Sequence, residues 1–439
     1  MQVDKTTLTD LSIFHNEEEQ SVFHHFNFAQ TNGGREYFKY ILSNPLDSVH
    51  AIKDCHITIQ ALMHMRDKWP LELITNGTIM MIEKFYETAI DSYPKQPDFF
   101  SSFIYKFLHS SDYSITKYTV THAISFLKGM QEILFLIAEE KKSNQLQTWY
   151  DQLEHFLEKP ILKEIAALDI NAKLSVKDNL YYANYLRKQF KRSIFELIDI
   201  FCKLDAYMSM AIACKKYAFE FPEVEDSEQP FVHATGLYHL LLPIPVAYDI
   251  SLDRNGNFIF LTGANMGGKS TYIKAVGLGV YLAHIGMGVP AKSMRLSLFD
   301  GLLSNIQVED NIFKGQSYFY NEVQRIKNTL EKISDGKNWL ILIDELFKGT
   351  NIQDAMKCST AVIEGLIKMK YSLFILSTHL YEIGDALKKY DNIQFRYFET
   401  NMTEDKIEFS YQIKDGISND RIGYLILKRE GVTKILENL

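Results

Sequence analysis

A glycine-rich loop at Gly263 to Ser270 constrains the fold of this chain more than any other feature. Its spacing is Gly-x-x-x-x-Gly-Lys-Ser, with Gly268 as the second glycine and Lys269 directly after it. Glycines let the backbone curl so that successive N–H groups point at phosphate oxygens. Lys269 supplies a positive charge for the β- and γ-phosphates, which makes it a catalytic candidate, and the Ser270 hydroxyl suits Mg²⁺. The loop therefore predicts a site for ATP and Mg²⁺.

The surroundings of the loop fit this prediction. Phe258 to Leu261 is a short apolar run that predicts a buried strand, and a helical pattern begins at Thr271. The N-terminus of that helix adds its own attraction for an anion. This strand–loop–helix order disfavours the alternative, an ordinary glycine-rich turn. The residues expected to contact the nucleotide are Gly263, Asn265, Met266, Gly267, Gly268, Lys269, Ser270 and Thr271.

A second apolar run ends in two carboxylates. Trp339 to Ile343 is followed by Asp344 and Glu345, so a buried strand would deliver both acids to the carboxyl edge of a parallel sheet, beside the loop. We expect Asp344 to bind Mg²⁺ together with Ser270, and Glu345 to orient or deprotonate the attacking water. Most adjacent acids are simply solvated, but their place after an apolar strand favours the functional interpretation.

Two further segments carry candidate site residues. Leu373 to Ser377 is a third strand-like run, and His379 after it would donate a hydrogen bond to the γ-phosphate, although a lone histidine is usually structural. Gly315 to Glu322 precedes a predicted helix, with Ser317 close to its start. Backbone N–H groups there could meet an anion, but from the residues alone Ser317 is only a helix N-cap.

Composition limits the classes of protein that remain. The net charge of −8 argues against a strongly basic nucleic-acid binder, although local basic patches remain possible. The four cysteines are scattered, as expected for reduced thiols rather than for disulfides or a zinc site. The N-terminus has no apolar signal core, and the most apolar long window, Tyr272 to Pro290, contains Lys274 and His284. We expect a cytoplasmic protein without a membrane partner.

The pattern of apolar and polar residues changes near residue 220. Residues 1–220 have helical periodicity, including one apolar face over Thr121 to Ala138. The stretch Lys177 to Ala218 lacks proline and predicts one helix of about 60 Å, suited to a strut or lever. Its basic cluster at 187–192 is expected to be a solvated face rather than a phosphate contact. Residues 221–230 are acidic, contain two prolines and predict a linker.

After this linker, strand-like runs alternate with helical stretches, which predicts an α/β domain with a largely parallel sheet. Besides the runs that start at Trp339 and Leu373, the short pair Leu298-Phe299 is expected to be a strand. Phosphate loop, acidic pair and histidine would then all meet at one edge of this sheet.

The motifs together resemble a known family. TGANMGGKSTYIKAVG, GQSYFYNEV, DELFKGTNIQDA and STHLYEI are similar, in order and spacing, to the ATPase domain of MutS DNA mismatch-repair proteins. The region from Tyr411 to Val432 is similar to the end of that domain. More loosely, Leu11 to Leu46 and the segment around Leu204 to Ala206 resemble the MutS core, or lever, domain. The resemblance is strong from about residue 230 and weak through 60–200.

This resemblance implies a fold and an assembly. The fold would be an α/β P-loop (ABC-type) ATPase domain at 231–439, preceded by an all-α core/lever domain at 1–220 and the linker at 221–230. The family implies a homodimer in which Ser317 reaches the partner's γ-phosphate, with Glu322 in the same motif. It also implies that DNA is the ligand, through an ATP-gated movement of lever helices.

The departures from the family limit the functional expectation. The chain begins at the core, so no mismatch-reading domain is expected, and it ends without the helical dimerisation tail. Ala264 replaces the usual proline, and Phe347-Lys348 replaces Gly-Arg. An ATP-driven scaffold or switch that acts on a protein or on ribosomal RNA is therefore the alternative to a DNA-acting ATPase. A small-molecule kinase is disfavoured, because kinases lack the Ser317 motif.

Overall fold

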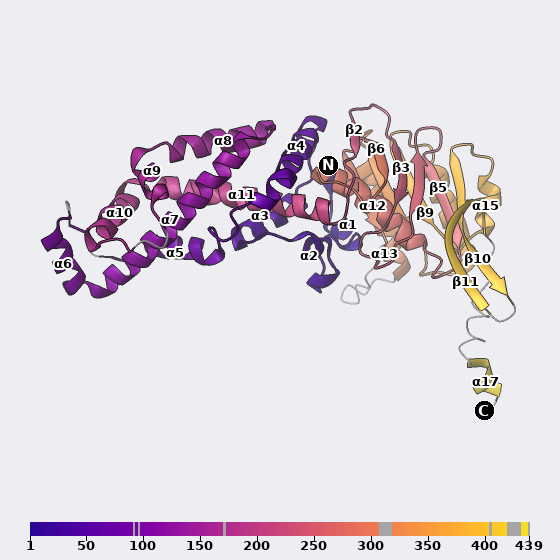
Figure 1. Ribbon diagram of the computed structural model, residues 1–439. Helices are drawn as coiled ribbons and strands as arrows, with labels where there is room; N and C mark the ends of the chain where they lie inside the picture. The colour runs from indigo at the N-terminus through magenta and orange to yellow at the C-terminus, as the bar shows by residue number, and fades with distance from the viewer. Residues whose placement is uncertain are drawn as a thin grey trace. The chain divides into compact units, whose positions relative to one another are not determined.

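The computed structural model describes residues 1–90, 93–94, 97–169, 173–306, 318–403, 406–418 and 432–437 (Figure 1). Its contacts divide the chain into two compact units. The sheet unit contains Met1–His25, Pro45–Lys53 and Tyr217–Leu439, and the helical unit contains Phe26–Asn44 and Asp54–Lys216. The N-terminal residues thus belong with the C-terminal half of the chain, which differs from the expected division at residues 221–230.

Hydrogen bonds explain why the N-terminus joins the sheet unit. The buried carboxylate of Asp10 accepts hydrogen bonds from the Ser304 hydroxyl at 2.5 Å and from the Ile306 N–H at 2.9 Å. The Thr7 hydroxyl accepts another from the Ser304 N–H at 2.9 Å. These polar groups are buried, so their pairing fixes helix α1 (Lys5–Asp10) against the sheet.

The described residues of the helical unit form helices and no strand. Helix α7 contacts α5, α6, α8, α9 and α10 and runs through the middle of the unit (Figure 1). The helices are α3 (Asn32–Ser43), α4 (Val49–Met65, which begins in the sheet unit), α5 (Asn76–Glu87), α6 (Phe99–Leu108), α7 (Ser110–Ala138), α8 (Asn144–Leu157), α9 (Pro160–Ala167), α10 (Val176–Gln189) and α11 (Lys191–Lys216).

The prediction of one long helix over Lys177 to Ala218 is wrong. Two helices, α10 and α11, meet at Phe190, where φ is −116° and ψ is 1°. No proline or glycine causes this break. The Phe190 side chain is fully buried, its ring stacks on Tyr185, and the Lys159 ammonium lies 5.4 Å from its centroid. Burial of the aromatic ring in the tertiary structure therefore overrides local helix propensity.

A buried carboxylate joins the two N-terminal segments that resemble the MutS core. Asp205 of α11 accepts hydrogen bonds from the N–H groups of Gln30 and Thr31 and from the Thr31 hydroxyl, at 3.0, 2.9 and 2.6 Å. A Cβ atom on Gly34 would lie 2.1 Å from an Asp205 oxygen, so this glycine permits the close approach. Burial raises the pKa of Asp205, and these donors oppose the shift.

Helix α7 is also long and apolar enough to cross a membrane, by length and composition alone. Half of its most apolar window is buried inside the protein. Core helices of soluble domains have the same character, so this helix carries no argument for a membrane.

The sheet unit contains two sheets and the helices around them. The large sheet has the order β1-β7-β8-β9-β5-β10-β11, parallel except for the antiparallel β10–β11 pair. Its strands are β1 (Gln2–Val3), β5 (Phe258–Gly263), β7 (Gly301–Asn305), β8 (Trp339–Asp344), β9 (Ser372–Ser377), β10 (Ile393–Thr403) and β11 (Lys406–Asp415). The small sheet has the order β2-β6-β3-β4, with β2 (Glu223–Glu225), β3 (Val232–Leu237), β4 (Tyr248–Leu252) and β6 (Ser293–Ser297).

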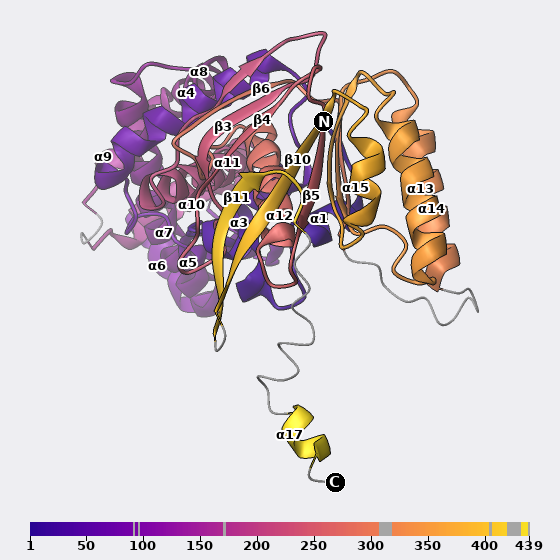
Figure 2. The same ribbon diagram turned by 90° about the vertical axis from the view of Figure 1, so that its right-hand side faces the viewer.

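Helices cover both faces of the large sheet. Helix α12 (Lys269–Ile285) contacts β5, β8 and β9 on one side and β3 of the small sheet on the other. Helices α13 (Tyr318–Ile333), α14 (Ile352–Leu366) and α15 (Glu382–Leu387) cover the opposite face (Figure 2). Every residue of β8 and β9 is buried, as expected for a parallel sheet between two layers. Helix α17 (Val432–Glu437) follows near the C-terminus.

The strand predictions hold for β5, β8 and β9 but not for Leu298-Phe299. These two residues connect β6 to β7, where the Leu298 N–H binds the Glu225 carbonyl and the Phe299 N–H binds Nε2 of His284. The first bond continues the β2–β6 pairing and the second ends on a histidine side chain, so the chain leaves the small sheet here without starting another strand. The expected linker at 221–230 contains β2, which pairs with β6.

Candidate nucleotide-binding site

The glycine-rich loop connects β5 to α12 with a backbone that only glycine adopts freely. Gly263 has φ of 135° and Gly268 has φ of 109°, and Gly268 is the N-cap of α12. A Cβ atom on Gly263 would lie 3.2 Å from the Phe398 backbone, so β10 also restricts this position. Met266 adopts φ of 69°, and its side chain is largely exposed. The loop thus has the curled backbone that phosphate binding requires.

The Lys269 ammonium lies at this loop. Its Nζ donates hydrogen bonds to the carbonyls of Gly263 and Ala264, at 2.8 and 3.0 Å. Burial lowers the pKa of Lys269, while the carboxylates of Glu345 and Asp344 oppose that shift. The ammonium and the N-terminus of the helix each attract a polyphosphate.

Ser270 and Asp344 are in direct contact, as the sequence predicts. The Ser270 hydroxyl lies 2.5 Å from Oδ2 of Asp344, and the Ser377 hydroxyl donates to Oδ1. The register of β8 and β9 places Asp344 opposite Ser377. This set of hard oxygen atoms fits Mg²⁺, which commonly uses one or two protein carboxylates together with phosphate oxygens.

Glu345 lies at the start of the next turn, with both carboxylate oxygens engaged. His379 Nε2 contacts Oε1, and the Lys348 ammonium lies 3.1 Å from Oε2. The Glu345 backbone has φ of 67°, and its N–H donates to the Ser377 carbonyl. Burial alone would raise the pKa of Glu345, but hydrogen bonds and charge from His379 and Lys348 outweigh it and lower the pKa to about 2.

The loop after Glu345 is tied to helix α13. The buried carboxylate of Glu322 accepts hydrogen bonds from the N–H groups of Lys348 and Gly349, at 3.0 and 3.1 Å. Phe347 adopts φ of 57°, a left-handed conformation that favours glycine. Its buried ring packs 5.7 Å from Phe319 on α13, and this packing offsets the backbone strain. Phe347-Lys348 therefore fits where the MutS pattern has Gly-Arg.

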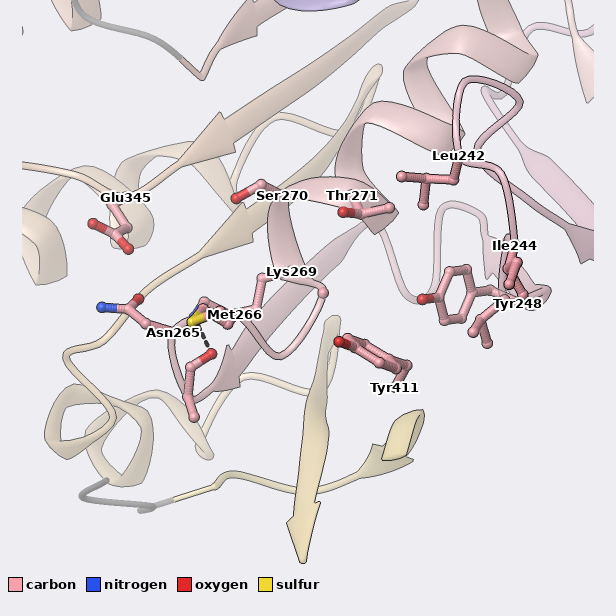
Figure 3. A pocket seen from close by; sticks show the side chains of 13 residues that line it. Leu242, Ile244, Tyr248, Asn265, Met266, Lys269, Ser270, Thr271, Glu345 and Tyr411 are labelled. Carbon is pink, nitrogen blue, oxygen red and sulfur yellow. Dashed lines mark hydrogen bonds between the residues drawn. The ribbon is translucent and has the colours of Figure 1, made fainter. Parts of the chain in front are cut away.

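A cavity of about 430 Å³ extends from the glycine-rich loop to an apolar end (Figure 3). Its lining there consists of Leu242, Ile244, Val246, Tyr248 and Tyr411. In Figure 3, Glu345 and Asn265 lie at the left and Tyr248, Ile244 and Tyr411 at the right, with Lys269 between them. The sequence analysis missed this apolar end. Its available signal was the apolar, proline-containing run at 240–246, in which Ile244 is 89% exposed.

The structure brings most predicted site residues together. Asn265, Met266, Gly268, Lys269, Ser270, Thr271 and Glu345 line the cavity. Asp344 contacts Ser270, and His379 contacts Glu345. Gly263 and Gly267 are part of the same loop. Ser317 lies outside the described residues.

Comparison with known proteins places this site in a family. The family model described as MutS domain V matches residues 259–437, which include the glycine-rich loop, the acidic pair and His379. The matched residues, 259–437, are a MutS-family domain, and the relatives found are MutS and MSH3 proteins. MutS domain V is the P-loop ATPase domain of that family, so the resemblance of the motifs is confirmed.

Individual relatives agree with the domain match. The chain is 28% identical over 246 residues to the DNA mismatch repair protein MutS of Petrotoga mobilis, covering 55% of this chain and 30% of that protein. It is 29% identical over 264 residues to the DNA mismatch repair protein MSH3 of Vanderwaltozyma polyspora, covering 57% and 26%. It is 32% identical over 191 residues to MutS of Listeria monocytogenes, covering 44% and 22%. The chain thus matches less than a third of the length of these relatives.

Proposed function

We propose that this chain is a Mg²⁺-dependent ATPase that hydrolyses ATP to ADP and phosphate. The observation that carries the proposal is one cavity that joins the Gly263–Ser270 loop and Glu345 to an apolar slot, with Asp344 against Ser270. In this proposal the loop N–H groups and Lys269 hold the β- and γ-phosphates. Ser270 and Asp344 hold Mg²⁺, which supplies charge neutralisation when bound.

The apolar end of the cavity is proposed to receive the adenine ring. Tyr411 and Tyr248 offer flat aromatic faces, and Leu242, Ile244 and Val246 add apolar surface. Stacking of a base on an aromatic side chain contributes about 1–3 kcal/mol and depends little on base identity. The slot therefore adds affinity without a demand for specific hydrogen bonds.

Glu345 is proposed to orient and deprotonate the attacking water, and His379 to contact the γ-phosphate. Both side chains are engaged with each other, and Lys348 occupies the second Glu345 oxygen. These contacts use one acceptor site on each oxygen of Glu345, so they compete with water for the carboxylate. We therefore infer that nucleotide binding draws His379 away from Glu345 towards the phosphate, and that turnover is slow before this exchange.

DNA is the proposed ligand, because the relatives are named DNA mismatch repair proteins. The proposed assembly is a cytoplasmic homodimer in which Ser317 completes the partner's nucleotide site and the helical unit acts as a lever. The alternative is a switch that acts on a protein or on ribosomal RNA. Within this alternative, the net charge of −8 favours a protein ligand, because acidic proteins bind polyanions such as DNA and RNA weakly.

Steady-state phosphate release by the full chain, with and without a macromolecular ligand, tests this proposal. Duplex DNA, branched DNA, single-stranded DNA and structured RNA are added separately at two salt concentrations. We expect Mg²⁺-dependent turnover that one or more DNA forms change, with an effect that weakens as salt rises. If no DNA form changes the rate of turnover, the ligand is a protein or ribosomal RNA, as in the alternative. If no turnover occurs in any condition, the ATPase proposal is contradicted.

A further inference from the structure

Helix α6 of the helical unit carries its large apolar side chains outward. Phe99, Phe100, Phe103 and Phe107 are 85%, 74%, 60% and 80% exposed, and Leu108 is 68% exposed. Ile104 is 39% exposed as well. Isolated exposed apolar residues are ordinary, but six on one ten-residue helix are not. A contiguous aromatic surface of this kind marks a contact site.

The buried side chains and the N-terminal cap of α6 set its orientation. Its buried residues are Ser102 and Tyr105, so the smaller or more polar side chains face the unit. The Tyr105 ring stacks on His109 at 4.9 Å and lies 5.6 Å from Tyr93. A capping box between Asp98 and Ser101 fixes the start of the helix. The phenylalanines therefore point outward because the opposite side of α6 is packed against the unit. Helix α6 lies at the end of the unit opposite α3 (Figure 1).

The exposed residues form a regular surface. Phe99, Phe103 and Phe107 are spaced by four residues, and Phe100, Ile104 and Leu108 form a parallel row beside them. Two adjacent rows of this type make a ridge and a groove, which is the geometry that a second helix packs against. The surface thus fits a helix.

The charges near α6 argue against a phosphate-rich partner. Lys106 is its one cation, and that ammonium lies over the Tyr113 ring at 5.5 Å. Helices that lie on anionic membranes carry several lysines or arginines on their polar face, and phosphate backbones require the same. The polar face of α6 is instead packed against α7 and α10.

We propose that α6 is the contact through which two copies of this chain pair, helical unit to helical unit. The four phenylalanines expose about 600 Å² in each copy, taking about 200 Å² for a whole side chain. Two copies would then bury about 1,200 Å², which reaches the range of specific protein interfaces. A helix packed on its own copy across a two-fold axis gives a closed dimer. This contact uses no part of the nucleotide site, so it forms without ATP.

The mass of the full chain in solution without nucleotide, measured by light scattering after size exclusion, tests this contact. Three proteins are compared: the unchanged chain, Phe103→Glu with Phe107→Glu, and a control with Leu71→Glu and Met80→Glu. Leu71 and Met80 are 48% and 58% exposed in the same unit. We expect dimers for the unchanged chain and the control, and a twofold lower mass for the α6 variant. Far-ultraviolet circular dichroism should show equal helix content for all three.

Other results would overturn the proposal. An α6 variant that keeps the dimer mass would place the interface elsewhere, and a monomeric unchanged chain would exclude self-pairing. Co-sedimentation of that monomer with phosphatidylcholine vesicles, lost in the α6 variant, would assign the face to a membrane. A Glu345→Gln background with ATP separates this contact from the ATPase proposal. There, an α6 variant that dimerises only with ATP supports both interfaces, whereas one that stays monomeric with ATP leaves the α6 contact standing and contradicts the nucleotide-completed dimer.

Discussion

The two ends of the nucleotide cavity are built in different ways. The phosphate end lies where β5 and β8 finish, and its side chains follow buried strands whose register fixes them to within one residue. The base end is formed by an exposed loop around Ile244 and by Tyr411 on the antiparallel strand β11. Triphosphate recognition requires backbone N–H groups at fixed spacing, whereas a purine needs only a flat apolar surface. A motif therefore marks the first end and not the second.

The same contrast predicts different kinetic roles. In the proposed function, residues of the base end contact a part of ATP that does not change during hydrolysis, so they would contribute equally to ground-state and transition-state binding. Residues around Glu345 are proposed to act on the water and on the γ-phosphate. The variants at the two ends should therefore separate affinity from turnover.

Tyr411→Ala is expected to give the larger effect. Loss of the stacking surface should raise the Kd for ATP about tenfold, while kcat at saturating ATP stays within about twofold. Tyr411→Phe is the matched control, because it keeps the ring and should bind almost normally. Isothermal titration with ATP measures the affinity. An unchanged Kd for ATP in Tyr411→Ala would show that the base binds elsewhere, and would contradict the contrast drawn between the two ends of the cavity.

Lys348→Ala is expected to change turnover by a smaller factor. Removal of this ammonium frees one oxygen of Glu345, so basal phosphate release should rise about two- to fivefold without a change in Kd. The pKa of Glu345, held at about 2 partly by Lys348, should rise as well. Because the ionised carboxylate is the active form, the acidic limb of the pH–rate profile should move to higher pH.

Lys388→Ala is the control for this variant. Lys388 pairs with Asp385 at 2.8 Å in the same sequence spacing as Lys348 with Glu345, and it lies outside the cavity. Its loss should leave both the rate and the pH profile unchanged. If Lys348→Ala behaves like Lys388→Ala, the ion pair at Glu345 has no part in restraining turnover.

The sequence predicted the phosphate end well because local patterns determine it. Three apolar runs end in Gly263, Asp344 and Ser377, and a parallel sheet brings such ends together. The Lys348–Glu345 contact and the base end depend on loops whose course no periodicity encodes. The break at Phe190 and the connection at Leu298-Phe299 were also missed, because burial of a ring decides the first and a bond to the distant His284 side chain contributes to the second.

The central claim is that one cavity binds ATP through Lys269 and hydrolyses it through Glu345. The most direct measurement compares ATP affinity and single-turnover phosphate release in the unchanged chain, Lys269→Ala and Glu345→Gln. We expect the unchanged chain to bind and hydrolyse, Glu345→Gln to bind with similar affinity but release phosphate at least about 100-fold more slowly, and Lys269→Ala to do neither. Hydrolysis by Glu345→Gln at the unchanged rate, or normal ATP affinity in Lys269→Ala, would contradict this account.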